Sequence, residues 1–251
     1  MEHILNHEKA HQKYFEEMTA IPHGSYHEQA YSAYLVAFAK EHGLKWIQDE
    51  LYNVIIYKDA SAGYEDHAPV LLQAHTDMVC EKNKDTDFDF EKDALKLYIE
   101  DGFLKARGTT LGADDGVGVA YMLALLSDPD AKHPPLECVF TVQEEVGLFG
   151  AMALKKEYFQ AKRMINLDDG GENATCTTSA GGVNVIMQKE RILVPHDGNG
   201  YQIDVFGLHG GHSGGEIDKE HGNANKLLAR VLFTLNRRYG VQLRWIQGGI
   251  K

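Results

Sequence analysis

The sequence predicts an α/β protein, with a layered α/β/α domain followed by a smaller α+β domain. Apolar strand patterns alternate with helix patterns through most of the chain, which is typical of a sheet covered by helices. Two predicted strands, 69–77 and 136–143, are apolar through their middle, as expected for strands buried on both faces. The pattern changes near Gly181-Gly182, where we expect the domain boundary.

Two helices are expected before the first strand, over 7–20 and 25–42. Ser25, followed three residues later by Glu28, has the pattern of a capping box at the start of the second helix. Gly43 is placed to end that helix.

The other expected elements follow in order. In the first domain they are a strand over 51–57, the strand over 69–77, a hairpin over 95–106 around Asp101-Gly102, a helix over 115–126, the strand over 136–143, a short helix over 147–154 and a strand over 163–169. In the second domain they are strands over 183–188, 201–208 and 241–247, and a helix over 224–239.

Composition excludes several classes of protein. The chain has 251 residues and a net charge of -12, which argues against a nucleic-acid-binding surface. It has no apolar run near the roughly 20 residues that a membrane span needs, and its polar start lacks the pattern of a signal peptide. Its three cysteines are widely spaced. We therefore expect a cytoplasmic protein that binds neither nucleic acid nor membrane.

Acidic side chains gather at the ends of the predicted strands. In an open α/β sheet, ligands bind beyond the carboxyl ends of the strands, so groups distant in sequence can converge there. One imidazole among several carboxylates is the donor set of a hard or borderline divalent cation. The residues concerned are His75 and Asp77, Asp114, Glu144 and Glu145, and Asp168.

Spacing predicts how two of these pairs act. His75 and Asp77 are two residues apart, so they share a face of a strand. Asp77 could then hold the second ring N–H of His75 and fix its tautomer. Glu144 and Glu145 are consecutive, so their side chains diverge, and one can bind a cation while the other reaches a water on that cation.

The stretch "GADDG" places two acids between glycines at the start of a predicted helix. A cation would relieve the repulsion between Asp114 and Asp115, and the glycines would let the backbone bend tightly. Asp114 is therefore a candidate bridging ligand between two metal ions, whereas Asp115 is expected to cap the helix. Each motif alone has an ordinary explanation as a helix start, a turn or a solvated surface. The occurrence of all four in order favours a metal site.

The motif order H-x-D, D-D-G, E-E and D resembles the di-zinc peptidase family that includes aminoacylases, tripeptide aminopeptidases and carnosinase-like dipeptidases. The stretches "LLQAHTDMVCEKN", "GTTLGADDGVGVAYMLALL", "FTVQEEVGLFGA" and "INLDDG" are most similar to its bacterial branch of aminoacyl-histidine dipeptidases. The resemblance covers nearly the whole chain and is specific, because four separated motifs agree.

The resemblance implies two divalent metal ions, zinc in first place with cobalt or manganese as alternatives. It makes Glu144 the general acid/base and Asp77 the residue that orients His75. It also implies a cis peptide bond between Asp114 and Asp115. The implied ligands are His75, Asp114 and Asp168 for one ion, and Asp114 and Glu145 for the other.

In the family, a lid domain interrupts the catalytic domain, which resumes afterwards. The resemblance thus makes 1–182 the first segment of the catalytic domain and 183–251 the start of the lid, a possible homodimer surface. The stretch "GLHGGHSGGEID" resembles the lid motif whose histidine helps to bind the substrate carbonyl, here His212. The alternative for His212 is a polar loop residue packed among glycines.

The family takes a further histidine for its second zinc from the returning catalytic segment. The sequence ends before such a segment, and His209 and His221 are poor substitutes because they lie in the lid portion. We expect a fragment of a longer protein rather than a defective relative, since every earlier motif is intact.

The implied reaction is the hydrolysis of short peptides, with dipeptides that carry a C-terminal histidine, such as β-alanyl-histidine, preferred. A related tripeptidase or N-deacylase is the nearer alternative, and a non-catalytic binding module is the more distant one. Phosphate binding is disfavoured, because "GADDGVG" would bring two negative charges to an anion.

Overall fold

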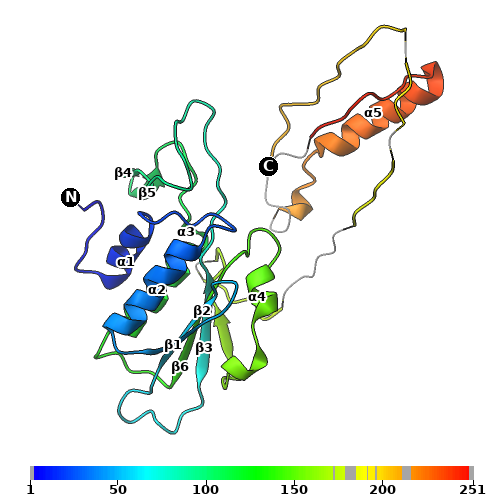
Figure 1. Ribbon diagram of the computed structural model, residues 1–251. Helices are drawn as coiled ribbons and strands as arrows, with labels where there is room; N and C mark the ends of the chain where they lie inside the picture. The colour runs from blue at the N-terminus through cyan, green and yellow to red at the C-terminus, as the bar shows by residue number, and fades with distance from the viewer. Residues whose placement is uncertain are drawn as a thin grey trace. The chain divides into compact units, whose positions relative to one another are not determined.

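The computed structural model describes residues 3–171, 173–178, 185–190, 192–195, 197–210 and 216–248. The chain divides into two compact units, Met1–Cys176 and Thr177–Lys251 (Figure 1). The boundary expected near Gly181-Gly182 lies outside the described residues.

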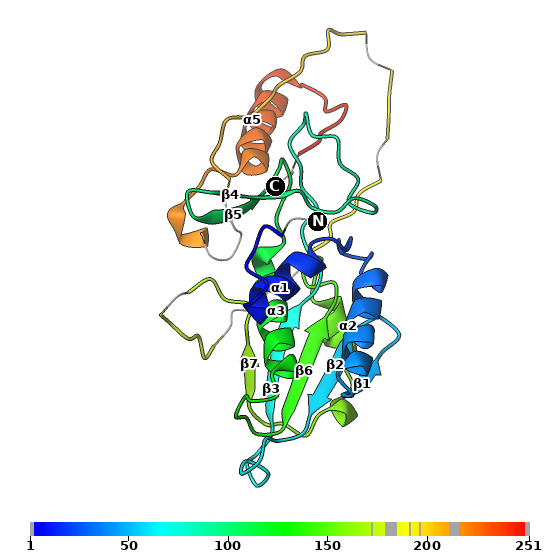
Figure 2. The same ribbon diagram turned by 90° about the vertical axis from the view of Figure 1, so that its left-hand side faces the viewer.

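The first unit is built on a five-stranded mixed sheet, which confirms the predicted α/β class. Strand β3 pairs in parallel with β6 and β7, whereas β2 pairs antiparallel with β1 and β6 (Figure 2). Across the sheet the order is β1 (Lys45–Gln48), β2 (Val54–Lys58), β6 (Leu136–Thr141), β3 (Val70–His75) and β7 (Met164–Asn166).

The register brings the carboxyl ends of three parallel strands, β3, β6 and β7, to the same end of the sheet. His75, the last residue of β3, lies opposite Thr141, the last residue of β6. Gln73 of β3 lies opposite Asn166, the last residue of β7. Residues that follow β3, β6 and β7 therefore emerge close together, which is where the acidic motifs occur.

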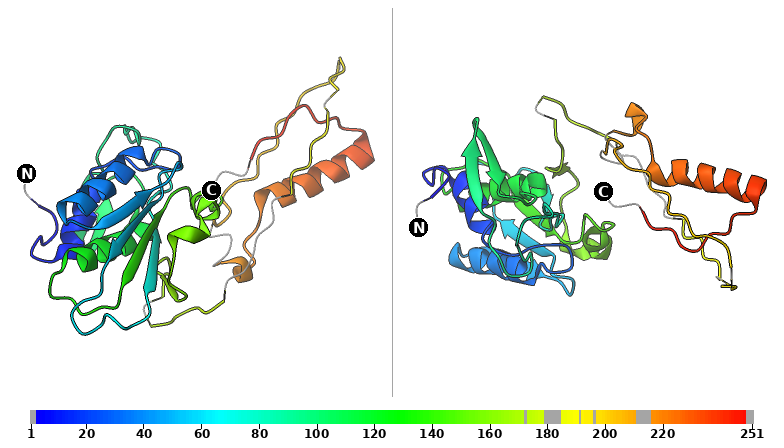
Figure 3. Two further views of the ribbon diagram at one scale, coloured as in Figure 1. Left: turned by 60° about the horizontal axis from the view of Figure 1, so that its bottom comes forward. Right: turned by 90° about the horizontal axis from the view of Figure 1, so that it is seen from above.

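Helices cover both faces of this sheet. Helices α1 (Ala10–Met18), α2 (Gln29–Glu41) and α3 (Ala113–Ser127) pack on one face, and the short helices α4 (Phe149–Ala153) and η1 (Lys156–Tyr158) lie on the other (Figures 2 and 3). The core beneath α1–α3 consists of apolar side chains from these helices and from alternate strand positions. Its strand residues include Val54, Ile56, Ala74, Leu136, Cys138 and Phe140.

In this unit the predicted start of one helix was wrong, and one strand was not predicted. Helix α2 begins at Gln29 rather than at 25, because the hydroxyl of Ser25 is used in a bond to Asp77 instead of capping the helix. Strand β1 was not predicted, because it is an edge strand with a mostly exposed, non-alternating pattern. The predicted hairpin is confirmed: β4 (Leu97–Glu100) and β5 (Phe103–Ala106) are joined by Asp101 and Gly102, with φ of 53° and 81°.

The second unit contains η2 (Ile217–Lys219) and α5 (Ala224–Tyr239), and the bounds of α5 match the prediction. The predicted strands over 201–208 and 241–247 do not form, nor does the described part, 185–188, of the strand predicted over 183–188. A strand needs a hydrogen-bonded neighbour, and none pairs with these segments in the part of the unit that the structure describes. Among all described residues, no helix has the length and apolar character needed to cross a membrane.

Candidate functional site

The candidate site lies at the end of the sheet where the carboxyl ends of β3, β6 and β7 meet. His75 is the last residue of β3, and Asp114 lies at the start of α3. Glu144 and Glu145 follow β6, and Asp168 follows β7. The structure therefore draws one imidazole and four carboxylates from four separate segments of the first unit.

His75 is the buried centre of this group, with only 1% of its surface exposed. Its Nδ1 lies 2.9 Å from the backbone oxygen of Asp77. A carbonyl oxygen only accepts, so Nδ1 carries the hydrogen and Nε2 faces the carboxylates. Nε2 lies 3.0 Å from Oδ1 of Asp114 and 3.9 Å from Oδ2 of Asp168.

The surroundings of His75 favour positive charge. Burial lowers the pKa of the imidazole, but hydrogen bonds with Asp114 and Asp77 and the charge of Asp168 outweigh it and raise the pKa to about 11. The field that favours a proton on Nε2 also favours a metal cation at that position, since both are positive.

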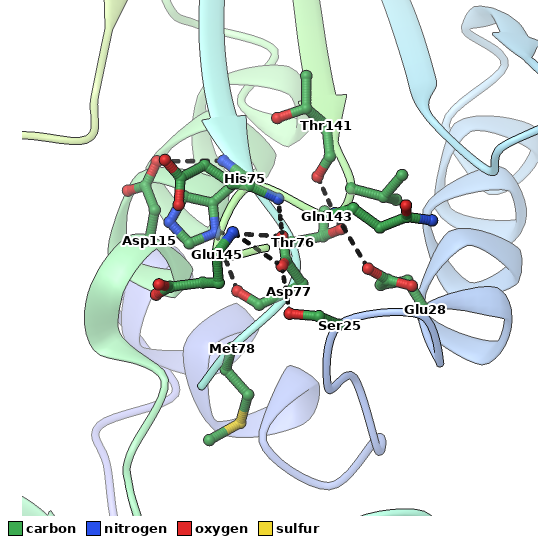
Figure 4. A network of polar contacts seen from close by, with 12 residues as sticks. Ser25, Glu28, His75, Thr76, Asp77, Met78, Asp115, Thr141, Gln143 and Glu145 are labelled. Atoms are coloured by element: carbon green, nitrogen blue, oxygen red, sulfur yellow. Dashed lines mark hydrogen bonds and ion pairs between the residues drawn. The ribbon is translucent and has the colours of Figure 1, made fainter. Parts of the chain in front are cut away.

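The carboxylate of Asp77 joins the segment that contains Ser25 to the loop that contains Glu144 and Glu145 (Figure 4). Its Oδ1 accepts a hydrogen bond from the backbone N–H of Glu144 at 2.9 Å. Its Oδ2 accepts from the hydroxyl of Ser25 at 2.7 Å and from the N–H of Glu145 at 3.3 Å. Burial raises the pKa of this carboxyl, but the hydrogen bonds from His75, Glu144 and Ser25 outweigh it and lower the pKa overall. Its carboxylate thus also fixes the backbone of the two glutamates.

The turn that carries Asp114 has the expected cis peptide bond between Asp114 and Asp115. Both residues have non-helical backbone angles, so the regular part of α3 begins after them. Asp115 caps the helix, as predicted: its Oδ1 accepts from the N–H of Gly118, and its Oδ2 accepts from the N–H of His75, both at 3.2 Å. Asp115 thereby ties the start of α3 to the end of β3.

The glycines around this turn serve close packing as well as bending. Gly112 has a φ of 71°, in the left-handed region that favours glycine. A Cβ at Gly116 would lie 2.5 Å from Cε of Met18, and one at Gly118 would lie 2.4 Å from Oδ1 of Asp115. Glycine at 116 thus lets α3 pack closely against α1, and glycine at 118 leaves room for the capping carboxylate of Asp115, which the sequence pattern did not reveal.

The donors fit a divalent cation in two overlapping groups, whose ligand atoms lie within 4.8 Å of one another in each group. One group is His75, Asp114 and Glu145, and the other is His75, Glu144 and Asp168. The pKa values of Glu144 and Asp168 are both raised overall, because burial and the neighbouring carboxylates outweigh the opposite effect of His75. A cation would relieve this repulsion, and imidazole with carboxylate is a donor set that suits zinc, cobalt and manganese.

A third group of potential ligands, His3, His7 and Glu16, lies at the N-terminal segment. Its geometry is explained without a metal. Oε1 of Glu16 accepts from the N–H of Ile4, and Oε2 accepts from the N–H of Leu5, both at 2.9 Å. Oε2 also lies 3.0 Å from Nε2 of His7. The carboxylate of Glu16 thus anchors the N-terminal segment to α1.

Sequence reasoning missed two residues of this network, Ser25 and Glu28. Their spacing has the pattern of a capping box, and this local explanation concealed their long-range contacts with Asp77 and Gln143. His212, predicted to bind the substrate, lies outside the described residues.

Comparison with known proteins agrees with this arrangement. Residues 71–235 match peptidase family M20/M25/M40. The chain is 46% identical over 220 residues to the cytosol non-specific dipeptidase of Escherichia coli (strain K12), a match that covers 87% of this chain and 45% of that protein.

Solved structures give the same result. The aminoacylhistidine dipeptidase of Vibrio alginolyticus superimposes with a TM-score of 0.65 at 34% identity, over 92% of this chain and 48% of that one. Aminopeptidase PepT of Bacillus cereus ATCC 10987 superimposes with a TM-score of 0.55 at 25% identity, over 67% and 45% of the two chains. The chain spans about half the length of these relatives. With the family motifs on the strand ends of a matching fold, the chain belongs to peptidase family M20/M25/M40.

Proposed function

We propose that the chain contributes most of a two-metal active site that hydrolyses dipeptides, with Xaa-His dipeptides such as β-alanyl-histidine preferred. The observation that carries this proposal is the gathering of His75, at the end of β3, with carboxylates that follow β6 and β7 and with one at the start of α3. The dipeptidases of Escherichia coli and Vibrio alginolyticus support the reaction class. The name of the second supports histidine at the C-terminal side of the substrate.

The residues of this chain suit distinct metal-binding roles. His75, Asp114 and Asp168 would hold one divalent ion, and Asp114 and Glu145 would hold the second, with zinc the expected metal and cobalt or manganese the alternatives. When bound, such a pair of ions polarises the scissile carbonyl and lowers the pKa of a nearby water. Asp77 would orient His75: its backbone oxygen accepts the hydrogen of Nδ1, and Oδ1 of its carboxylate lies 3.5 Å from the same nitrogen, so that Nε2 would be left to bind an ion.

Glu144 is the proposed general acid/base. Its carboxyl is half-buried, and burial raises its pKa towards the range in which it can both accept and return a proton. It would take a proton from the attacking water and deliver it to the leaving amine. Its backbone N–H is held by Oδ1 of Asp77, which limits the positions that the side chain can reach.

The remaining proposals concern the whole protein. Residues 1–182 would be the first segment of the catalytic domain, and 183–251 the start of a lid that also provides a homodimer surface. His212 would bind the substrate carbonyl from this lid. The name of the Escherichia coli relative and the scattered cysteines support a cytoplasmic location.

Glu144→Gln in the full-length protein tests the reaction. We expect kcat for β-alanyl-histidine to fall by at least about 10²-fold, because the proton acceptor is lost, while the metal content is unchanged. Glu145→Gln is the matched comparison, and it should lower the content of the second metal ion. Metal analysis and a panel of dipeptides, tripeptides and N-acyl amino acids provide the measurements.

Other results would contradict the proposal in identifiable ways. Undiminished kcat in Glu144→Gln removes that residue from the chemistry. Faster cleavage of tripeptides or N-acyl amino acids points to the related peptidase or deacylase. A wild-type protein that binds no metal and cleaves nothing is a binding module.

A further inference from the structure

Glu28 is a buried carboxylate that the proposed chemistry does not use. It lies just before α2, and only 2% of its surface is exposed. Its Oε1 accepts a hydrogen bond of 3.0 Å from the backbone N–H of Gln143, a residue 115 positions away (Figure 4). A carboxylate is costly to bury, so this contact requires an explanation.

Gln143, whose N–H donates to Glu28, directly precedes Glu144 and Glu145 in the chain. Gln143 lies between the end of β6 at Thr141 and Glu144, and its φ of 54° places a non-glycine residue in the left-handed region. Strand pairing of β6 stops at Thr141, so no neighbouring strand accepts the N–H of Gln143. Glu28 supplies the acceptor for this N–H and thereby supports a backbone conformation that glutamine does not favour.

The next two residues are held in the same manner. The N–H groups of Glu144 and Glu145 donate to the carboxylate of Asp77. Three successive backbone N–H groups, 143 to 145, are thus held by two buried carboxylates, Glu28 and Asp77. Asp77 is linked to His75 as well, whereas Glu28 is joined to this loop through Gln143 and otherwise bonds to the backbone of its own segment, at Tyr26 and Glu28.

We infer that Glu28 is a positioning residue for the reaction: its carboxylate fixes the peptide that leads into Glu144 and Glu145, and so sets where the proton acceptor and a metal ligand lie. This inference rests on the proposed function of those two glutamates. The role needs a hydrogen-bond acceptor at the place of Oε1 rather than a negative charge, and this distinction can be tested.

Variants of Glu28 in the full-length protein separate the acceptor from the charge. Glu28→Ala should lower kcat by about 10²-fold, the effect of displacing a catalytic group by about 1 Å, with KM little changed. Glu28→Gln keeps an acceptor oxygen at the same reach and should stay within a few-fold of the wild type. Glu28→Asp keeps the charge but withdraws the acceptor, and it should resemble Glu28→Ala even if the alanine variant folds poorly.

Glu137, in β6, provides a matched control. It is also a buried carboxylate that accepts backbone N–H groups, from Gln160 and Ala161, but it lies in β6 near the opposite end from the site. Glu137→Ala should lose stability as Glu28→Ala does while kcat remains at the wild-type value. Equal kcat in the two alanine variants would overturn the inference, as would a Glu28→Gln variant as slow as Glu28→Ala.

Hydrogen exchange separates failure of this inference from failure of the proposed function. Amide exchange at residues 143–145 should accelerate at least about tenfold in Glu28→Ala, and remain unchanged in Glu28→Gln and Glu137→Ala. If the wild type cleaves no peptide, the proposed function fails, and exchange alone decides whether Glu28 holds the loop. Unchanged exchange in Glu28→Ala overturns the inference whatever the activity.

Discussion

The two units of the chain form their secondary structure by different means. In the first unit the predicted apolar strands form, because each finds hydrogen-bonded neighbours in one sheet. In the second unit helix α5 forms at its predicted bounds, whereas the described residues of the predicted strands remain unpaired. A helix satisfies its backbone within one segment, but a strand depends on another segment.

The side chains show the same difference. Phe140 of β6 is fully buried, whereas Phe233 of α5 is 64% exposed. Helix α5 is capped at both ends by neighbouring residues. Oδ1 of Asn223 accepts from the N–H of Lys226, and Gly240, with a φ of 67°, ends the helix. Within the described residues, the first unit is held by long-range packing and α5 by its own ends.

Truncation of a core phenylalanine should give the largest effect. We expect Phe140→Ala to lower the free energy of unfolding of the first unit by about 3–5 kcal/mol, because it leaves a cavity under α1–α3. Phe233→Ala, on the exposed face of α5, should change stability by less than about 0.5 kcal/mol. In a Trp245→Phe background, urea unfolding followed by the fluorescence of Trp46 reports on the first unit. Equal losses of unfolding free energy in Phe140→Ala and Phe233→Ala would show that the two units do not differ in their dependence on long-range packing.

Removal of metal should act on the first unit alone. All the proposed ligands within the described residues belong to that unit. At free zinc about 100 times Kd, binding should contribute about 2.7 kcal/mol to its stability. Chelation should therefore lower the melting temperature and speed amide exchange at 75–78 and 143–146, with no change over 224–239. The variant His75→Ala should abolish the shift, and a shift that persists there places the metal elsewhere.

Loss of a helix cap should give the smallest effect, confined to the second unit. Asn223→Ala removes the acceptor for the N–H of Lys226 and should destabilise α5 by about 1 kcal/mol. Amide exchange at 225–228 measures the change. Asn223→Ser keeps a capping oxygen and should retain most of the protection. A serine variant as labile as the alanine one would show that the cap does not hold the helix.

Much of the site could be predicted, because its residues follow strands that have a strong apolar pattern. His75, the two glutamates and Asp168 all lie within four residues of the end of β3, β6 or β7. The convergence of parallel strand ends then required no knowledge of the strand order. The cis bond after Asp114 came from the family resemblance, since no local pattern distinguishes it from a trans bond.

The residues that hold the site in place, as opposed to those that form it, could not be predicted from the sequence. Ser25 and Glu28 have a spacing that local rules assign to a helix start, yet both side chains bond to segments far along the chain. Gly116 was expected to let the backbone bend and Gly118 was not singled out, whereas the small size of both is needed against Met18 and Asp115. These functions depend on which surfaces meet, and spacing along the chain does not encode that.

The sequence by itself determined the periodicity of helices and strands, the caps of α5 and the placement of acids after strands, because these depend on neighbours within a few residues. Only the tertiary structure decided that β6 lies between β2 and β3, that β1 joins the edge, and that Glu28 meets Gln143. The reason is that strand pairing and buried hydrogen bonds draw their free energy from contacts between distant segments. Those contacts exist only once the sheet has assembled.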